Sequence, residues 1–204
     1  GSRALLAAGQ IFCWGDHHIL PIEQSTGDVG YGWFTGYQLA MDGDHAFTLS
    51  GQSLIKLDRE AYAVGSRARH DLEEGRRPIM RKIYTTEGEE LEAAKSEMLA
   101  LEAKIAEAEH VGVVWKSPFA GQSALLVAGD VVFAGKEGGV AAFSAETGEL
   151  LWNAEVDGDA RGLAVADGHL FVSTDTGKIY AFASESAPAA PSGVAEKPIC
   201  AAPF

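Results

Sequence analysis

Short runs of hydrophobic residues, separated by tight turn signals such as Asp-Gly, recur along this chain. The same pattern is found four times, in residues 5–22, 39–57, 125–143 and 162–182. Each copy has a phenylalanine at the same place, and the four are Phe12, Phe47, Phe133 and Phe171. The first and last intervals between them are 35 and 38 residues, a repeat length typical of β-propeller blades. The middle interval holds one repeat and about 50 additional residues.

The last copy shows how one unit is built. Asp167 and Gly168 separate two hydrophobic runs, and glycine accepts the positive φ that a type I′ hairpin turn requires. In the third copy, a turn at residues 144–148 precedes a fourth run at 149–156. Such units have hydrophobic residues on both faces, so each sheet must pack against neighbours. We therefore expect an all-β fold, a partial β-propeller of about four four-stranded antiparallel blades, with an inserted α-helical hairpin.

Residues 142–152 read Ala-Phe-Ser-Ala-Glu-Thr-Gly-Glu-Leu-Leu-Trp. This segment resembles the tryptophan-docking repeat of quinoprotein-like (PQQ-like) propellers, a family that includes quinone-dependent alcohol dehydrogenases and the propeller lipoprotein of the outer-membrane barrel-assembly machinery. Ser144 stands where the family usually has Asp. Trp115 matches the tryptophan of the preceding blade, whereas the first copy keeps its Thr-Gly pair but has its tryptophan displaced to Trp33. The resemblance implies that Trp115 and Trp152 pack between adjacent blades, and that the protein belongs to the periplasm or cell envelope.

Residues 59–110 interrupt the repeats. Residues 87–109 are rich in strong helix formers and carry a heptad of hydrophobic positions, as in a coiled coil. These positions are Leu91, Ala94, Met98, Leu101, Ile105 and Ala108. Because residues 59–82 are basic and 87–109 acidic, we expect an antiparallel helical hairpin, with Gly65 and residues 75–78 breaking its first half. It leaves after one strand and returns before the next, so it should extend from a loop. It is either a solvated arm that packs only on itself or a docking arm for a partner.

Charge and composition exclude some partners. The chain has 29 acidic and 16 basic residues, a net charge of −13, which argues against binding a nucleic-acid backbone. No run of hydrophobic residues is long enough to predict a membrane span. We expect residues 1–186 to form the propeller blades, interrupted by 59–110, and the Pro/Ala-rich residues 187–204 to form a flexible linker or tail. A start inside a blade and an end in a linker suggest a segment of a larger protein.

The sequence offers little catalytic chemistry. Asp16-His17-His18 is the one local histidine cluster, and neighbouring side chains on a strand point to opposite faces, so a solvated turn is favoured over a metal site. Quinone-dependent relatives bind their cofactor beside two adjacent cysteines, with calcium held by acidic and amide side chains. Cys13 and Cys200 are far apart in sequence. We therefore predict no catalytic, cofactor-binding or metal-binding residues and no cofactor.

Two functions remain open. The chain is either a non-catalytic propeller segment that acts as an interaction scaffold within a larger cell-envelope protein, or an accessory propeller region of a larger enzyme. In the first case its partner is another protein or the remaining blades of a larger propeller. A catalytic motif in flanking sequence would favour the enzyme, and further Thr-Gly-x-x-x-Trp repeats would favour the scaffold.

Overall fold

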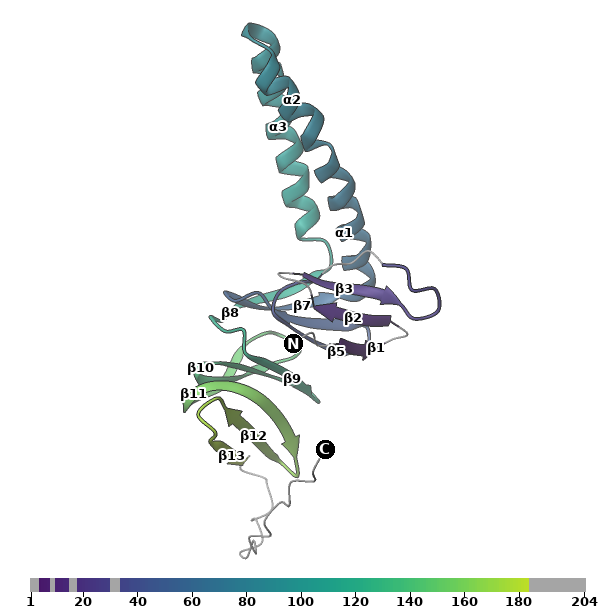
Figure 1. The fold of residues 1–204 in the computed structure, drawn as a ribbon. Coiled ribbons are helices and arrows are strands. Elements are labelled where there is room, and N and C mark those ends of the chain that lie inside the picture. Colours follow the sequence, from purple (N-terminus) through teal and green to yellow (C-terminus); the bar gives the residue numbers. More distant parts are fainter. Residues whose placement is uncertain (1–3, 8–9, 15–17, 30–33, 184–204) are drawn as a thin grey trace, which may run out of the picture.

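The computed structural model describes residues 4–7, 10–14, 18–29 and 34–183, which form three antiparallel sheets and a helical arm (Figure 1). The sheets follow one another along the body of the molecule, and the arm extends away from it. Trp33, the Asp16-His17 pair and the predicted tail at 187–204 lie outside the described residues. None of the helices in the described part is both long and apolar enough to cross a membrane.

The strands and helices have the following bounds. The first sheet has the order β1-β2-β3-β4 and contains β1 (Ala4–Ala7), β2 (Gln10–Trp14), β3 (His18–Glu23) and β4 (Phe34–Thr35). The second has the order β5-β6-β7-β8 and contains β5 (Gln38–Asp42), β6 (His45–Leu49), β7 (Ser53–Asp58) and β8 (Val113–Pro118). The third contains β9 (Ala124–Ala128), β10 (Val131–Ser144), β11 (Leu150–Ala166), β12 (His169–Thr174) and β13 (Ile179–Ala183). The arm contains α1 (Arg59–Glu74), α2 (Arg76–Thr85) and α3 (Gly88–Glu109).

The third sheet differs from the predicted arrangement of separate four-stranded blades. Its five strands have the order β13-β12-β11-β10-β9, because β11 is 17 residues long and takes part in two repeats. Residues 150–159 of β11 pair with β10, and residues 160–166 pair with β12. The third and fourth repeats are therefore joined through one continuous strand.

The repeat seen in the sequence is visible in the sheets. Phe12, Phe47 and Phe171 lie in β2, β6 and β12, each the second strand of its repeat, and Phe133 lies in the equivalent first part of β10. Asp167 and Gly168 have φ values of 49° and 73°, both positive, as a type I′ turn requires. The predicted hairpin turn is therefore confirmed.

The Thr-Gly turn also has the same geometry in two repeats. Gly27 and Gly148 have φ values of 78° and 74°. The hydroxyl groups of Thr26 and Thr147 each accept a hydrogen bond from the backbone N–H two residues later, at 3.2 and 3.3 Å. In the third repeat the Ser144 hydroxyl accepts the N–H of Thr147 at 3.2 Å. Ser144 therefore supplies the turn-stabilising acceptor that Asp supplies elsewhere in the family pattern.

Three clusters of buried side chains hold successive repeats together. The first contains Phe12, Ile19, Phe34, Leu39, Ala46, Leu57 and Tyr62. The second contains Phe47, Leu49, Leu54, Phe119, Val132, Ala134, Ala141, Phe143 and Ala145. The third contains Val140, Val156, Ala160, Leu170 and Val172. Each cluster takes residues from two consecutive repeats, so the core runs from one sheet face to the next.

Trp115 joins the second sheet to the third. Its indole N–H donates to the carbonyl oxygen of Ala145 at 3.3 Å, and the Lys56 ammonium donates to the same oxygen at 2.9 Å. The indole lies against Gly148, where an added Cβ would come within 2.7 Å of the ring. The ring also packs on Phe47 with centroids 5.8 Å apart. The fourth strand of one repeat thus contacts the Thr-Gly turn of the next.

Trp152 is in a different environment. It is 37% exposed and packs edge-to-face on Phe182, with centroids 5.0 Å apart. The positions equivalent to Ala145 and Gly148 in the fourth repeat come after residue 183 and lie outside the described residues. The two tryptophans therefore differ in how much they contribute to packing.

This difference predicts unequal effects of alanine substitutions. Trp115→Ala should lower the free energy of unfolding by about 3–5 kcal/mol, the usual cost of truncating a well-packed aromatic side chain. Trp152→Ala should cost clearly less, because much of its ring already contacts solvent. Urea denaturation followed by circular dichroism measures both. Equal midpoint shifts would show that the indole of Trp115 is not the contact that joins the sheets.

Candidate interaction surfaces

The residues singled out for chemistry in the sequence are dispersed in the structure. Cys13 lies in β2 with a free thiol, and Cys200 lies outside the described residues. Only the backbone of His18 is described. His45 and His169 begin β6 and β12 and pair with Asp42 and Ala166 directly across the hairpin turn. Both histidines therefore occupy the same position of the repeat, the first residue after the hairpin turn.

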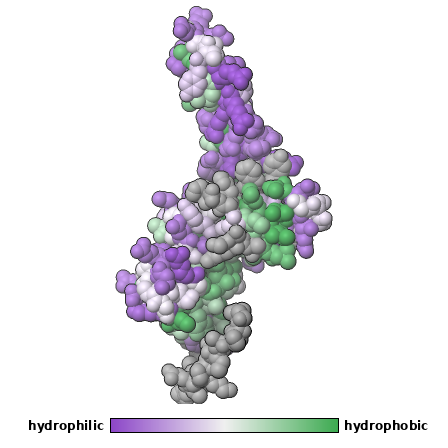
Figure 2. All heavy atoms as spheres, in the orientation of Figure 1, coloured by the Kyte–Doolittle hydropathy of each residue, from purple (hydrophilic) through white to green (hydrophobic). Residues whose placement is uncertain are grey.

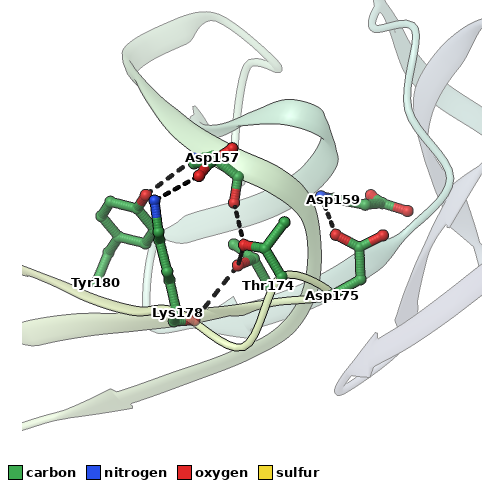
Figure 3. Close-up of polar contacts among 7 residues, drawn as sticks. Asp157, Asp159, Thr174, Asp175, Lys178 and Tyr180 are labelled. Atoms are coloured by element: carbon green, nitrogen blue, oxygen red, sulfur yellow. Dashed lines mark hydrogen bonds and ion pairs between the residues drawn. The ribbon is translucent and has the colours of Figure 1, made fainter.

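A polar network of Asp, Thr, Lys and Tyr residues lies on the last repeat and the strand before it (Figure 3). Asp157 is its centre: its backbone N–H donates to the Tyr180 hydroxyl at 2.9 Å, and its carboxylate accepts from the Lys178 ammonium. The Thr176 hydroxyl donates to the Asp157 carbonyl at 2.9 Å. Hydrogen bonding and the charge of Asp157 raise the pKa of Lys178. These contacts fix the turn between β12 and β13 against β11.

A second set of contacts in the same network involves two further aspartates, Asp159 and Asp175. The Asp175 carboxylate accepts the backbone N–H of Asp159 at 2.8 Å, and the Asp159 carboxylate lies 2.9 Å from the Arg161 side chain. Gly158 has a φ of 89°, and an added Cβ would come within 2.5 Å of the Asp175 carboxylate. Among the described residues, no group of three His, Cys, Asp or Glu side chains is placed to hold a metal ion. These aspartates stabilise the turn between β12 and β13. The sequence analysis missed this role, although the Asp157-Gly158-Asp159 segment is a signal that could have identified it.

A groove of about 690 Å³ lies between the second and third sheets. Gln52 and Phe119 line one side, and Lys136, Asn153 and Glu155 line the other. The Lys136 ammonium lies 5.9 Å from the Phe119 ring centroid, a cation–π distance. The groove thus has polar side chains along its lining, while its aromatic residue Phe119 is buried beneath Lys136.

The helical arm is the largest feature outside the sheets. In Figure 1, α1 and α2 run outward from the body and α3 returns antiparallel to them. All six predicted heptad positions of α3 are buried or half-buried, with Ala94 and Ile105 the most buried. The Arg76 guanidinium donates two hydrogen bonds of 2.7 Å to Glu102, and Lys82 lies 2.9 Å from Glu97. Side-chain hydrogen bonding to Arg76 lowers the pKa of Glu102. Hydrophobic packing and opposite charge therefore both join the two halves of the arm.

One of the two predicted breaks in the first half of the arm is present. α1 ends at Glu74 and α2 begins at Arg76, so the break predicted at residues 75–78 is confirmed. Gly65 was also expected to break the first half, but α1 runs through it. A Cβ at Gly65 would come within 2.5 Å of Val111 and 3.3 Å of the Ala108 carbonyl. Gly65 therefore allows α1 to approach the end of α3 closely, and this close contact is why its helix-weakening tendency is overcome.

The base of the arm is part of the sheet core. Tyr62, in the first turn of α1, is 7% exposed and stacks on Phe34 with centroids 5.3 Å apart and planes 15° from parallel. Gly112 passes so close that an added Cβ would lie 2.3 Å from the Tyr62 nitrogen. The expectation of an arm that packs only on itself is therefore wrong at its base, because Tyr62 belongs to the cluster between the first two sheets.

The arm also occupies a defined place in the repeat. It connects β7 to β8, which pair antiparallel from Ser53 with Pro118 to Leu57 with Val113. In the first and third repeats, the Thr-Gly turn makes this connection between third and fourth strands. Phe34 comes from the fourth strand of the first repeat, as Trp115 does in the second. The stacking of Phe34 on Tyr62 thus takes the place of the tryptophan contact at this junction.

Two deletions should separate the base of the arm from its outer part. Replacing residues 71–101 with a short Gly/Ser connector should leave the β-sheet signal and the unfolding midpoint almost unchanged, because loop length alters closure entropy only slowly. Replacing residues 59–110 should destabilise the sheets, because Tyr62 is lost. Circular dichroism with urea denaturation measures both variants.

The matched control is Tyr62→Ala in the full chain, which keeps the arm and removes one side chain. It should cost about 3 kcal/mol, the lower end for truncating a buried aromatic residue. If Tyr62→Ala left stability unchanged while deletion of 59–110 lowered it, another part of the arm base would be the stabilising contact.

Comparisons with known proteins agree with the repeated sheets. The chain resembles the solved structure of BamB from Moraxella catarrhalis with a TM-score of 0.50 and 10% identity, over 87% of this chain and 41% of that one. It resembles the computationally designed Ika4 protein with a TM-score of 0.52 and 12% identity, over 88% of each chain. It resembles the computationally designed Ika8 protein with a TM-score of 0.51 and 11% identity, over 89% of this chain and 45% of that one. At such identities these likenesses show the fold alone.

The chain spans less than half the length of the BamB and Ika8 chains that it matches. None of the curated proteins compared with it matches. A family model described as outer membrane protein assembly factor BamB matches residues 35–162 and 105–190. These two ranges cover most of the sequence and include the second, third and fourth repeats. The chain therefore belongs to the family of quinoprotein-like β-propellers that this BamB model describes.

Proposed function

We propose that this chain is a non-catalytic β-propeller region that acts as a protein-interaction scaffold in the cell envelope. The observation that carries the proposal is the arm, whose base is fixed in the sheet core by Tyr62 and whose outer part extends into solvent. Ordering a helical pair of this length costs conformational entropy for each residue in it. The sheets do not need its outer part for their own packing. A docking role for a partner accounts for that outer part.

The surface of the arm supports this role. Figure 2 shows a mainly hydrophilic arm above a body with hydrophobic areas. Tyr84, near the outer end of α2, and Leu99, midway along α3, are nevertheless 79% and 75% exposed. Aromatic residues such as Tyr84 are enriched in protein interfaces relative to the rest of the surface. The charged residues around them would give a partner electrostatic orientation.

The location and the blade number are further parts of the proposal. The matching family model is described as an outer membrane protein assembly factor, which supports a place in the cell envelope. The four phenylalanine-centred repeats support four blades, with the third and fourth joined through β11. The fourth blade would obtain its fourth strand from residues beyond 183 or from a partner.

The alternative, an accessory region of a larger enzyme, is tested by quinone binding. We expect no stoichiometric uptake of pyrroloquinoline quinone in the presence of calcium, because Cys13 stands alone in β2 and lacks an adjacent cysteine. Absorbance titration measures uptake, and dye reduction with alcohols measures turnover. Saturable uptake at one quinone per chain, with dye reduction, would replace the scaffold proposal by the enzyme.

Site-specific photo-crosslinking tests the arm as a docking element. A photoreactive residue at Leu99 or Tyr84, in cells that make the protein, should give a discrete adduct with one envelope protein, identified by mass spectrometry. The matched control is the same residue at Asp42, an exposed position on the body. Adducts of equal yield at Asp42, or none at either arm position, would count against docking through the arm.

A further inference from the structure

Among the described residues, the first and the last sheet each have one hydrophobic face that no other sheet covers. We call the face that a sheet turns toward the next repeat its forward face, and the opposite one its rear face. Residues alternate between the two faces along a strand. The phenylalanine in the second strand of each repeat lies on the forward face. Phe12, Phe47 and Phe133 each contact the cluster that is shared with the following repeat.

The residues flanking these phenylalanines lie on the rear face. Ala46 contacts the cluster shared with the preceding repeat, as do Val132 and Ala134 in the third repeat. Leu170 and Val172 do the same in the fourth. In the second strands, every internal junction therefore joins the phenylalanine of a forward face to smaller aliphatic residues of a rear face.

The forward face of the last repeat has no covering sheet among the described residues. Phe171 is 38% exposed, and Ile179, on the neighbouring strand, is 75% exposed. Cross-strand pairing places Ala164 and Ala181 beside Phe171 on the same face. None of the forward-face positions that pair across these three strands is Asp, Glu, Lys or Arg: they are Gly162, Ala164, Ala166, His169, Phe171, Ser173, Ile179, Ala181 and Ala183. This face has the composition of an internal junction and contacts solvent instead.

The rear face of the first sheet is the matching half. Ile11 and Cys13 flank the buried Phe12, as Leu170 and Val172 flank Phe171. Pairing across the sheet adds Ile22 next to Ile11, and Leu20 next to Cys13. Figure 2 shows hydrophobic surface over the part of the body that Figure 1 assigns to β1–β3. Figure 1 also shows that the first and last sheets lie apart, so they do not cover each other within one chain.

We propose that two copies of this chain associate head to tail, with the forward face of the last repeat of each copy packed on the rear face of the first sheet of the other. Two such contacts close a ring with twofold symmetry, which uses up both exposed faces. The ring reproduces the kind of junction already present inside the chain. Its size agrees with the comparisons, because one copy covers 45% of Ika8 and 41% of BamB.

This association is independent of what the arm binds, and its test uses purified protein alone. Light scattering after size exclusion should give twice the 21.5 kDa mass of one chain. Ile179→Glu and Ile11→Glu, one on each face, should each convert the dimer to a monomer, because a charge buried in a hydrophobic contact is strongly unfavourable. Val64→Glu, on the exposed side of the arm, is the matched control and should stay dimeric. Circular dichroism confirms that each variant remains folded.

Mixing the two monomeric variants tests the head-to-tail geometry. In a mixed pair one junction contains both altered faces, and the other contains two unaltered faces, so dimers should reappear, more weakly than for the wild-type chain. If the dimer instead formed by pairing one face with the same face of the other copy, only the substitution on that face would prevent association. That result overturns the proposal.

A wild-type chain that stays monomeric at the highest concentration measured also overturns it. In that case a variant lacking residues 184–204 identifies the occupant: dimers of this variant would show that those residues cover the forward face. Both results are independent of crosslinking to the arm, so failure of self-association and failure of the scaffold role are distinguishable.

Discussion

The structure depends on one kind of contact, in which an aromatic side chain from the fourth strand of a repeat packs on the connection between the third and fourth strands of the next. Trp115 makes it with Ala145 and Gly148, through a hydrogen bond to the first and a close ring contact with the second. Lys56 reinforces it by donating to the same carbonyl. Gln38 and Ser117 add hydrogen bonds between the same two repeats, to the carbonyl oxygens of Ser123 and Gly148. Hydrophobic faces alone could slide, because the hydrophobic effect is not directional. The hydrogen bonds fix their relative position.

The same contact explains how an arm can be part of a propeller-like body. At the junction of the first two sheets, the connection between third and fourth strands is the arm, and no Thr-Gly turn is present there. Tyr62 supplies the surface on which Phe34 stacks. Gly112 makes room for the Tyr62 backbone at this point. The base of the arm therefore takes the structural place of the Thr-Gly turn, and only the part beyond the base is an addition to the repeat.

The sequence predicted much of this and missed particular parts for identifiable reasons. The repeat, the Asp167-Gly168 turn and the heptad of α3 were predictable because each depends on residues close together in the chain. The contact of Tyr62 with the sheets was not, because it joins residues 28 positions apart through a junction that no local pattern marks. Gly65 was misjudged as a helix breaker, since its close approach to Val111 is visible only in three dimensions. The continuity of β11 was not predictable, because an Asp-Gly pair such as Asp157-Gly158 usually marks the end of a strand. In the structure Gly158 has a positive φ, and β11 nevertheless continues through it.

The position of the arm has a consequence for how this family can diversify. Because β7 and β8 are neighbours in the sheet, the chain between them can grow or shrink without shifting the register of any strand. What must be kept is a small set: Asp58, whose carboxylate accepts the Ala61 N–H and starts α1, and the Tyr62 and Gly112 pair at the base. Changes in the outer part of the arm leave these contacts in place, so the same body can carry an arm of different length and surface chemistry.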